Sequence, residues 1–421
     1  MFNRIKIIFK DKGLRNKILF VLAVLVLFRI GSSIPIPGVD HARLSSFLSN
    51  NQFFGLLDIF SGGGLSNLSI LMLGVAPYIT ASIIMQLFTM IFPKLKELYQ
   101  EEGEAGRQKF NQYSRLLTVP LGFLQGFGLM TMLQGQGILG QISFLDKFTN
   151  ISIMIAGTMV LLWLGELISE KGIGNGISLI IFGGIVAGLP STIQRTLFTF
   201  DPSQIPMYGL FLAIAVVIIG GVVIISEAER LVPVSYAKQV RGSRVYGGVS
   251  THIPLKVNQA GVIPIIFAIS ILLFPQMIVN LLAGLNSGMV ASLSGYILAF
   301  LNNSFVYGAL YFVLVFFFTY FYTAVTFDPK MISQNLQKSG AFVPGIRPGQ
   351  PTSEHLAKII TRITLVGALF LGLIAVLPLG IKALTGISSL AIGGTALLIV
   401  VSVVLETSKQ IEAQVVMKEY E

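Results

Sequence analysis

The sequence predicts an all-α polytopic membrane protein. Of its 421 residues, 53% are hydrophobic and only 11% are charged, and the mean hydropathy is positive. This composition excludes an ordinary soluble domain. The apolar runs are continuous for about twenty residues, the length of a membrane-spanning helix, whereas strands of a membrane β-barrel alternate apolar and polar residues. We therefore expect spanning helices.

Ten apolar runs are predicted to span the membrane. The first follows a basic N-terminus, residues 1–17, but it is too long for a signal peptide and lacks a small-x-small cleavage site, so we interpret it as a retained span. The ten predicted spans are residues 18–34, 68–92, 116–133, 151–168, 177–189, 208–225, 257–282, 305–327, 359–377 and 387–405.

The distribution of lysine and arginine predicts the orientation. Most of the 29 basic residues fall on the side of the N-terminus, which the positive-inside rule places in the cytoplasm. The same rule puts the tail, residues 406–421, on that side. We expect a multi-pass protein of a bacterial cell membrane with both termini cytoplasmic.

The second predicted span, residues 68–92, carries no charge but contains Gly74 and Pro77. A proline inside a helix removes a backbone donor and bends or breaks the helix. In lipid such a break is tolerated where protein or a water-filled cavity covers it, so we expect this helix at the centre of the bundle, beside a pore. The preceding segment, residues 53–67, contains three consecutive glycines and is interpreted as a movable part.

Two long basic loops, residues 227–256 and 328–358, are predicted to lie in the cytoplasm. Loops of this length in a compact bundle are usually functional, so we interpret them as docking surfaces. The alternative is that they are solvated connections. Five spans in each half, residues 18–194 and 195–405, make any internal repeat inverted across the membrane, with a pathway at the repeat interface.

The residues that most enzymes and coupled carriers need are missing. The three histidines lie in separate loops and there is no cysteine, so we expect no metal, no cofactor and no catalytic site. The glycine cluster at residues 172–176 follows a predicted span rather than a strand and is interpreted as a tight turn, and Ser178 has no histidine in any span to act as its base. Five spans hold no ionisable residue at all, which argues against an ion-coupled transporter.

An apolar constriction in a pore would suit the passage of a large substrate better than ion-coupled transport. It blocks water and ions by dewetting, yet it widens for a large substrate without binding chemistry. A solute transporter is the second hypothesis and a membrane-embedded enzyme the third.

The chain resembles the SecY family, the central subunit of the bacterial Sec protein-conducting channel, over nearly its whole length. The resemblance rests on six motifs in order: IPIPG at residues 34–38, FSGGGLSNLSILMLGVAPYITASIIMQL at 60–87, WLGELISEKGIGNGISLIIFGGIVAGLP at 163–190, KVNQAGVIPIIFA at 256–268, FVPGIRPGQPT at 342–352 and GGTALLIVV at 393–401.

This resemblance implies a central hourglass pore closed by an aliphatic ring, a plug and a lateral gate between the second and seventh spans. The implied ring is Val75, Ile79, Ile181, Ile185, Ile266 and Ile399. The implied plug, within residues 53–67, is Phe54, Leu57, Ile59, Phe60, Gly62, Gly63 and Gly64. Candidates for a polar cluster at the gate are Thr80, Gln86, Asn258 and Gln259.

The resemblance also implies partners. These are small membrane subunits of the SecE and SecG type, the SecA motor ATPase, the ribosome contacted through its RNA, signal peptides, nascent chains and the lipid bilayer. Arg347, on a turn rich in glycine and proline, is the first candidate for docking, followed by Arg241 and Arg244. Basic loops suit both RNA phosphates and acidic protein patches.

Overall fold

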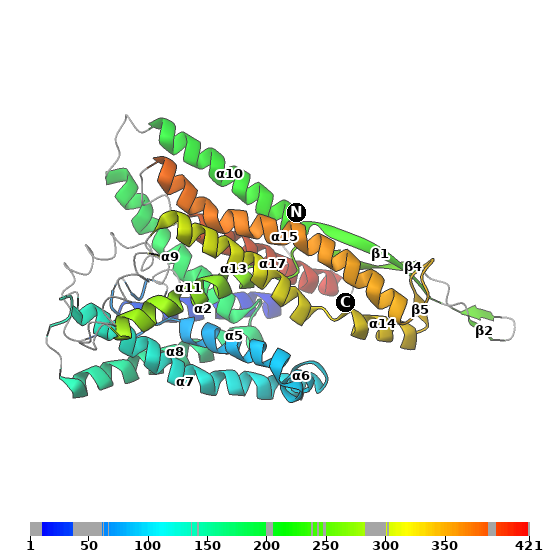
Figure 1. The fold of residues 1–421 in the computed structure, drawn as a ribbon, viewed down its shortest axis with the longest axis horizontal. Coiled ribbons are helices and arrows are strands. Elements are labelled where there is room, and N and C mark those ends of the chain that lie inside the picture. Colours follow the sequence, from blue (N-terminus) through cyan, green and yellow to red (C-terminus); the bar gives the residue numbers. More distant parts are fainter. Residues whose placement is uncertain are drawn as a thin grey trace.

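In a computed structural model the protein is a mostly helical bundle with a small β-sheet at one end (Figure 1). The structure describes residues 11–36, 61, 63–65, 67–135, 137–140, 143–198, 205–236, 239–241, 244–246, 250–282, 300, 303–385 and 393–419. The long helices run side by side along the longest axis, and the sheet projects from the end where α6 and α14 lie. That end carries the two loops predicted to be cytoplasmic.

Each of the ten predicted apolar runs overlaps a helix, although several helices begin or end well away from the predicted bounds. In the first half the helices are α2 (Lys12–Ser32), α5 (Ala76–Ile91), α6 (Pro93–Gln100), α7 (Gly103–Gly135), α8 (Phe144–Lys171) and α9 (Gly176–Phe198). In the second half they are α10 (Ile205–Glu227), α11 (Ile263–Leu282), α13 (Ser304–Thr326), α14 (Pro329–Lys338), α15 (Gln350–Thr385) and α17 (Gly393–Glu419). The predicted tail is described as far as Glu419 and continues α17.

Fewer helices than ten meet a membrane-length test within the described residues. Four are long and apolar enough to cross a membrane: Gly103–Gly135, Phe144–Lys171, Ser304–Lys338 and Gln350–Ile381. A fifth qualifies only if α5 and α6 count as one span, although they bend by 113° where they meet. Shorter apolar helices are described at Gly176–Pro190, Leu212–Glu227 and Ile263–Leu272.

The prediction of one broken helix over residues 68–92 is wrong. Helix α5 begins at Ala76, and residues 68–75 form turns, because Leu68 has a φ of 40° and Gly74 a φ of 55°, values that a right-handed helix does not contain. Pro77 therefore lies in the first turn, where its missing N–H costs no helical hydrogen bond. The proline starts this helix and does not break it.

The seventh predicted span also starts later than expected. Residues 257–262 form a bend before α11, with Gly261 at a φ of 61°, so Asn258 and Gln259 lie ahead of the helix and not on it. Gly367 on α15 makes room for this bend, because a Cβ there would lie 2.7 Å from the carbonyl oxygen of Val257.

The two long loops are joined by a β-sheet, which corrects the purely α-helical prediction. Strand β1 (Glu229–Tyr236) pairs antiparallel with β4 (Ser250–Lys256) in the first loop and with β5 (Ala341–Phe342) in the second, in the order β4-β1-β5. A second hairpin, β2 (Gln239–Arg241) with β3 (Arg244–Tyr246), extends beyond it. Alternate residues Val232 and Val234 point inward, as strand geometry requires. They pack in a small core with Leu255, Ala341, Val343, Leu356 and Ile360.

The glycine cluster at residues 172–176 is the tight turn expected from its sequence. Gly174 has a φ of 92°, and a Cβ on Gly176 would lie 1.8 Å from the carbonyl oxygen of Gly165, so no side chain fits there. Asn175 caps the next helix, because its Oδ1 accepts from the N–H groups of Ile177 and Ser178. This turn brings the end of α8 directly against the start of α9.

Candidate pore constriction and seam between the halves

All six predicted ring residues are buried together, although they come from four helices and the residue that precedes one of them. Val75 immediately precedes α5, Ile79 lies on α5, and the others lie on α9, α11 and α17. Their exposed fractions are 0% for Val75, 8% for Ile79, 2% for Ile181, 7% for Ile185, 9% for Ile266 and 2% for Ile399. All belong to one hydrophobic cluster, which is the largest in the molecule's described part.

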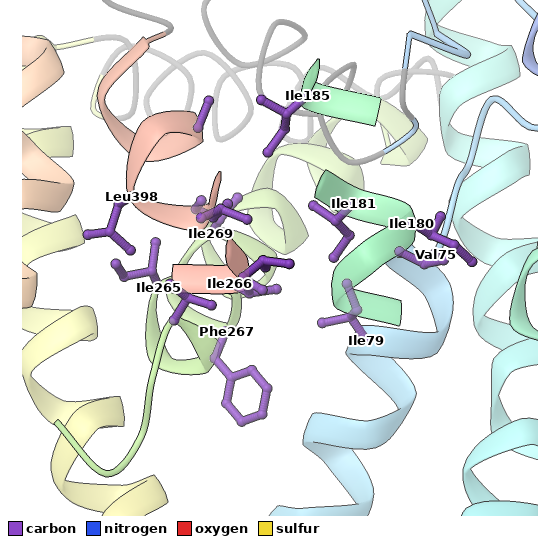
Figure 2. Close-up of a cluster of buried hydrophobic side chains, with 14 of the residues drawn as sticks. Val75, Ile79, Ile180, Ile181, Ile185, Ile265, Ile266, Phe267, Ile269 and Leu398 are labelled. Atoms are coloured by element: carbon purple, nitrogen blue, oxygen red, sulfur yellow. The ribbon is translucent and has the colours of Figure 1, made fainter. Parts of the chain in front are cut away.

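Figure 2 shows how the two halves contribute to this cluster. Val75, Ile79, Ile180 and Ile181 lie on one side, and Ile265, Ile266, Ile269 and Leu398 lie opposite them. Val75 and Ile79 lie on the same side because they are one helical turn apart: the Ile79 N–H donates to the carbonyl oxygen of Val75 at 3.0 Å. The constriction is therefore a meeting of aliphatic side chains from α5 and α9 with those from α11 and α17.

Sequence reasoning missed several members of this constriction. Ile180, Ile265, Ile269 and Leu398 are each at most 1% exposed and belong to the same cluster. A helical repeat was available for Ile269, which follows Ile266 by three residues on the same face. No such signal was available for Ile180, because adjacent residues of a helix point in different directions, yet the packing buries both Ile180 and Ile181 in the same cluster.

The segment before α5 is fixed to the end of the first span. The Ile36 N–H donates to Leu68 O at 2.8 Å, and the Ile70 N–H donates to Ile34 O at 3.0 Å. Leu65 and Leu68, both 1% exposed, pack in a second cluster with residues of α7 and α8. Residues 34–36 of the IPIPG motif therefore pair with the segment that leads into the constriction.

Most of the predicted plug lies outside the described residues, namely Phe54, Leu57, Ile59, Phe60 and Gly62. Gly63 and Gly64 are described. Gly63 has a φ of 82°, and a Cβ on Gly64 would lie 2.9 Å from the Oγ of Ser69. These two glycines form a tight turn against the segment that precedes α5.

The four predicted gate residues do not bond to one another among the described residues. Thr80 accepts from Gln125 Nε2 on α7 at 3.3 Å, and Gln86 donates to Ser82 at 3.5 Å on its own helix. Asn258 Nδ2 donates to Gly261 O at 3.2 Å within its own bend.

Two buried side-chain oxygens of this group, Gln86 Oε1 and Asn258 Oδ1, have no hydrogen-bond partner among the residues that the structure describes. Gln259 is half-buried beside Asn258. Among the described residues, the side-chain hydrogen bonds of Thr80, Gln86 and Asn258 therefore each stay within one half of the molecule.

Arg347 is exposed on a rigid turn at the end of the molecule that holds the sheet. Gly345 and Gly349 have φ values of 81° and 97°, and the Arg347 carbonyl accepts from Thr352 Oγ1 at 2.8 Å. Ser333 Oγ of α14 donates to Gly349 O at 2.6 Å and ties the turn to that helix. Arg241 and Arg244 are register partners in the β2–β3 hairpin.

Sequence reasoning missed one ion pair, between the residue just before the third predicted span and a residue of the fourth. Arg115 of α7 and Glu166 of α8 lie 2.5 Å apart and join these neighbouring helices. Among the described residues, no three His, Asp or Glu side chains gather in the manner of a metal site. His252 and His355 are described in separate elements, β4 and α15, and His41 lies outside the described residues.

Comparisons with known proteins agree on one family. The protein-family model of SecY matches residues 69–408. The protein translocase subunit SecY of Corynebacterium glutamicum is 43% identical, with 98% of each chain covered. The SecY subunit of Streptomyces galbus is 44% identical over 98% of this chain and 97% of its own.

Solved structures share the fold at lower identity. A structure described as a protein conducting channel superimposes with a TM-score of 0.63 and 20% identity, over 94% of this chain and 91% of the other. Sec61 in the canine ribosome-channel complex from the endoplasmic reticulum gives a TM-score of 0.60 and 19% identity, over 94% and 91%. Because the family model spans most of the chain and the bacterial relatives align over nearly all of it, this chain belongs to the SecY family.

Proposed function

We propose that this protein is a protein-conducting channel that passes unfolded secretory chains across the bacterial plasma membrane and releases apolar segments sideways into lipid. The observation that carries this is the constriction, where buried aliphatic side chains of both halves meet with no charged residue on α11 or α13 beside them. Such a contact excludes water and ions by dewetting, yet breaking it requires no bond to be cut. A threaded polypeptide parts it by displacing side chains.

The finer arrangement belongs to the same proposal. Ten spanning helices form two inverted halves around an hourglass pore, both termini lie in the cytoplasm, and the plug around residues 53–67 closes the outer side. Helices α5 and α11 border the lateral gate. No nucleotide-binding motif occurs in the sequence, so the driving energy comes from a partner, either the SecA motor ATPase or the ribosome, and SecE and SecG type subunits complete the complex.

The sheet supports a single docking unit. Because β1 pairs with both β4 and β5, the two basic loops share one core and present Arg347 on a fixed turn. A partner that binds one loop therefore also positions the other. Their basic residues suit RNA phosphates and acidic protein surfaces.

Reconstitution tests the function directly. Vesicles containing this protein with its small subunits, the motor ATPase and ATP should protect a secretory precursor from external protease, and a precursor without its signal should stay exposed. Saturable uptake of a small solute by the protein alone, without precursor protection, would replace the channel by a transporter.

Arg347→Glu tests the docking unit. The variant should insert normally, but motor-driven export should fall on the order of tenfold, because reversed charge opposes an acidic or phosphate partner. Lys171→Glu is the matched control, since Lys171 is also exposed but lies far along the chain from either loop. Equal export by both variants would remove Arg347 from the docking surface.

A further inference from the structure

One side chain of the first half, that of Gln100, donates a hydrogen bond to the last turn of a helix in the second half. Gln100 Nε2, at the end of α6, donates to the carbonyl oxygen of Val325, in the last turn of α13, at 3.3 Å. The last carbonyls of a helix have no partner within it, so they need a donor from elsewhere. Gln100 supplies that donor across the boundary between the halves.

Gln100 is held rigidly on the side of α5 and α7. A Cβ on Gly106 of α7 would lie 2.1 Å from the carbonyl oxygen of Leu98, so α6 lies directly on the start of α7. The rings of Tyr99 and Phe110 pack with centroids 4.8 Å apart. The 113° bend then connects α6 to α5 without a flexible linker. If α5 and α7 move, Gln100 moves with them.

Val325 is held equally firmly on the other side. Its side chain is 8% exposed and belongs to the main cluster. On the same helix, Phe318 and Tyr322 each pack edge-on against Phe267 of α11, with centroid distances of 5.9 and 6.1 Å. Helices α11 and α13 therefore form one body, to which the accepting carbonyl belongs.

The front seam is the contact of α5, α6 and α7 with α11 and α13. Among the described residues of these five helices, Gln100 to Val325 is the side-chain hydrogen bond that crosses it. The other polar groups there bond locally, as Thr80 does to Gln125 and Gln86 to Ser82. Figure 1 places α6 at the end of the molecule where α13 passes into α14, so the bond lies at the end of the seam that the proposed function places in the cytoplasm.

We propose that Gln100 is a specificity-determining latch of the front seam. Its amide holds the cytoplasmic end closed by capping α13, and the bond must break before the seam parts. Since the closed state gains this bond and the open state lacks it, the latch sets how apolar a segment must be to enter lipid rather than cross. This inference rests on the proposed channel function.

The native chain allows a clean test by substitution. Gln100→Ala removes the donor, and Gln100→Glu replaces it by a carboxylate that repels the carbonyl. Gln100→Lys keeps a donor and places a positive charge at a helix C-terminus, which is favourable. Gln125→Ala is the matched control, because that glutamine also makes one side-chain hydrogen bond but to Thr80 within the same half.

The experiment uses the complete complex and a series of test segments of graded hydrophobicity. It measures the fraction of each segment that is inserted into lipid rather than exported. The midpoint is the hydrophobicity at which half of the test segments are inserted. At the wild-type midpoint, Gln100→Ala and Gln100→Glu should raise the odds of insertion about fivefold, the effect of losing one hydrogen bond. Gln100→Lys and Gln125→Ala should keep the wild-type midpoint. Export of an ordinary secretory precursor should change less than about twofold in all four.

Two outcomes would overturn the latch, and both differ from failure of the channel. An unchanged midpoint in Gln100→Ala and Gln100→Glu, with normal export, would show that the bond does not control opening. If Gln100→Lys raised the odds of insertion as much as Gln100→Glu, the effect would come from altered packing and not from the lost hydrogen bond. If the wild-type complex neither exports nor inserts any substrate, the proposed function itself is wrong.

Discussion

The two halves of the molecule meet along two seams that are built differently. The front seam brings α5, α6 and α7 against α11 and α13, and the rear seam brings α2 and α9 against α17. At the front, buried side-chain oxygens of Gln86 and Asn258 have no hydrogen-bond partner within the described part of the chain. At the rear, Lys17 Nζ donates to Gln414 Oε1 at 3.4 Å beside a cluster of Leu14, Ile173 and Val415.

This difference indicates which seam opens. Unpartnered buried oxygens cost free energy in the closed state, and that cost is recovered when water or a peptide reaches them. An apolar cluster with satisfied polar neighbours gains nothing by separating. We therefore expect the front seam to part and the rear seam to hold the two halves together.

The largest effect should follow from damage to the rear seam. Val415→Asp places an unpaired carboxylate among Leu14 and Ile173 and should destabilise the protein by about 3–5 kcal/mol. The apparent melting temperature of the purified complex measures this loss. Val416→Asp is the control, because Val416 is 38% exposed and Val415 only 2%. Equal melting temperatures for the two variants would mean that the rear cluster does not hold the halves.

A smaller effect on stability, but a clear one on sealing, should follow from a polar residue in the constriction between the seams. Ile266→Asn should wet the contact at a cost of about 1–3 kcal/mol, raise ion leak through reconstituted vesicles and permit export of precursors with defective signals. Ile266→Leu preserves volume and polarity and should keep the seal. Unchanged leak and unchanged signal discrimination in Ile266→Asn would remove Ile266 from the ring.

The smallest effect should come from Thr80, which was predicted to act at the gate. Thr80→Val removes the bond from Gln125, but both partners belong to the first half. We expect a stability change below about 1 kcal/mol and an insertion midpoint equal to that of the wild type. The graded-segment assay checks this against Gln100→Ala. A shift as large as that of Gln100→Ala would place Thr80 in the opening step.

The predictability of the site depended on the distance over which its residues interact. Val75 with Ile79 and Ile181 with Ile185 share helix faces, so periodicity alone paired them. Ile266 was placed with them only through family resemblance, and the structure buries it in the same cluster. The role of the ring as a seal stays a prediction.

The polar residues were harder to interpret from sequence. Thr80, Gln86 and Asn258 were grouped because amides and hydroxyls are rare in apolar runs, but rarity does not identify a partner. Each bonds to a group on its own element or on a neighbour in the same half. Gln100 attracted no notice because it stands in an ordinary polar stretch, PKLKELYQ.

By itself, the sequence determined the class of protein, the positions of the apolar runs and the loops in which basic residues gather, because hydropathy and charge add up along the chain. Only the tertiary structure decided that residues 68–75 are not helical, that two loops share one sheet, and which side chains cross the front seam. Those features depend on contacts between distant residues, such as Gln100 and Val325, which are 225 positions apart. The pattern of residues along the chain does not indicate which distant residues will be in contact.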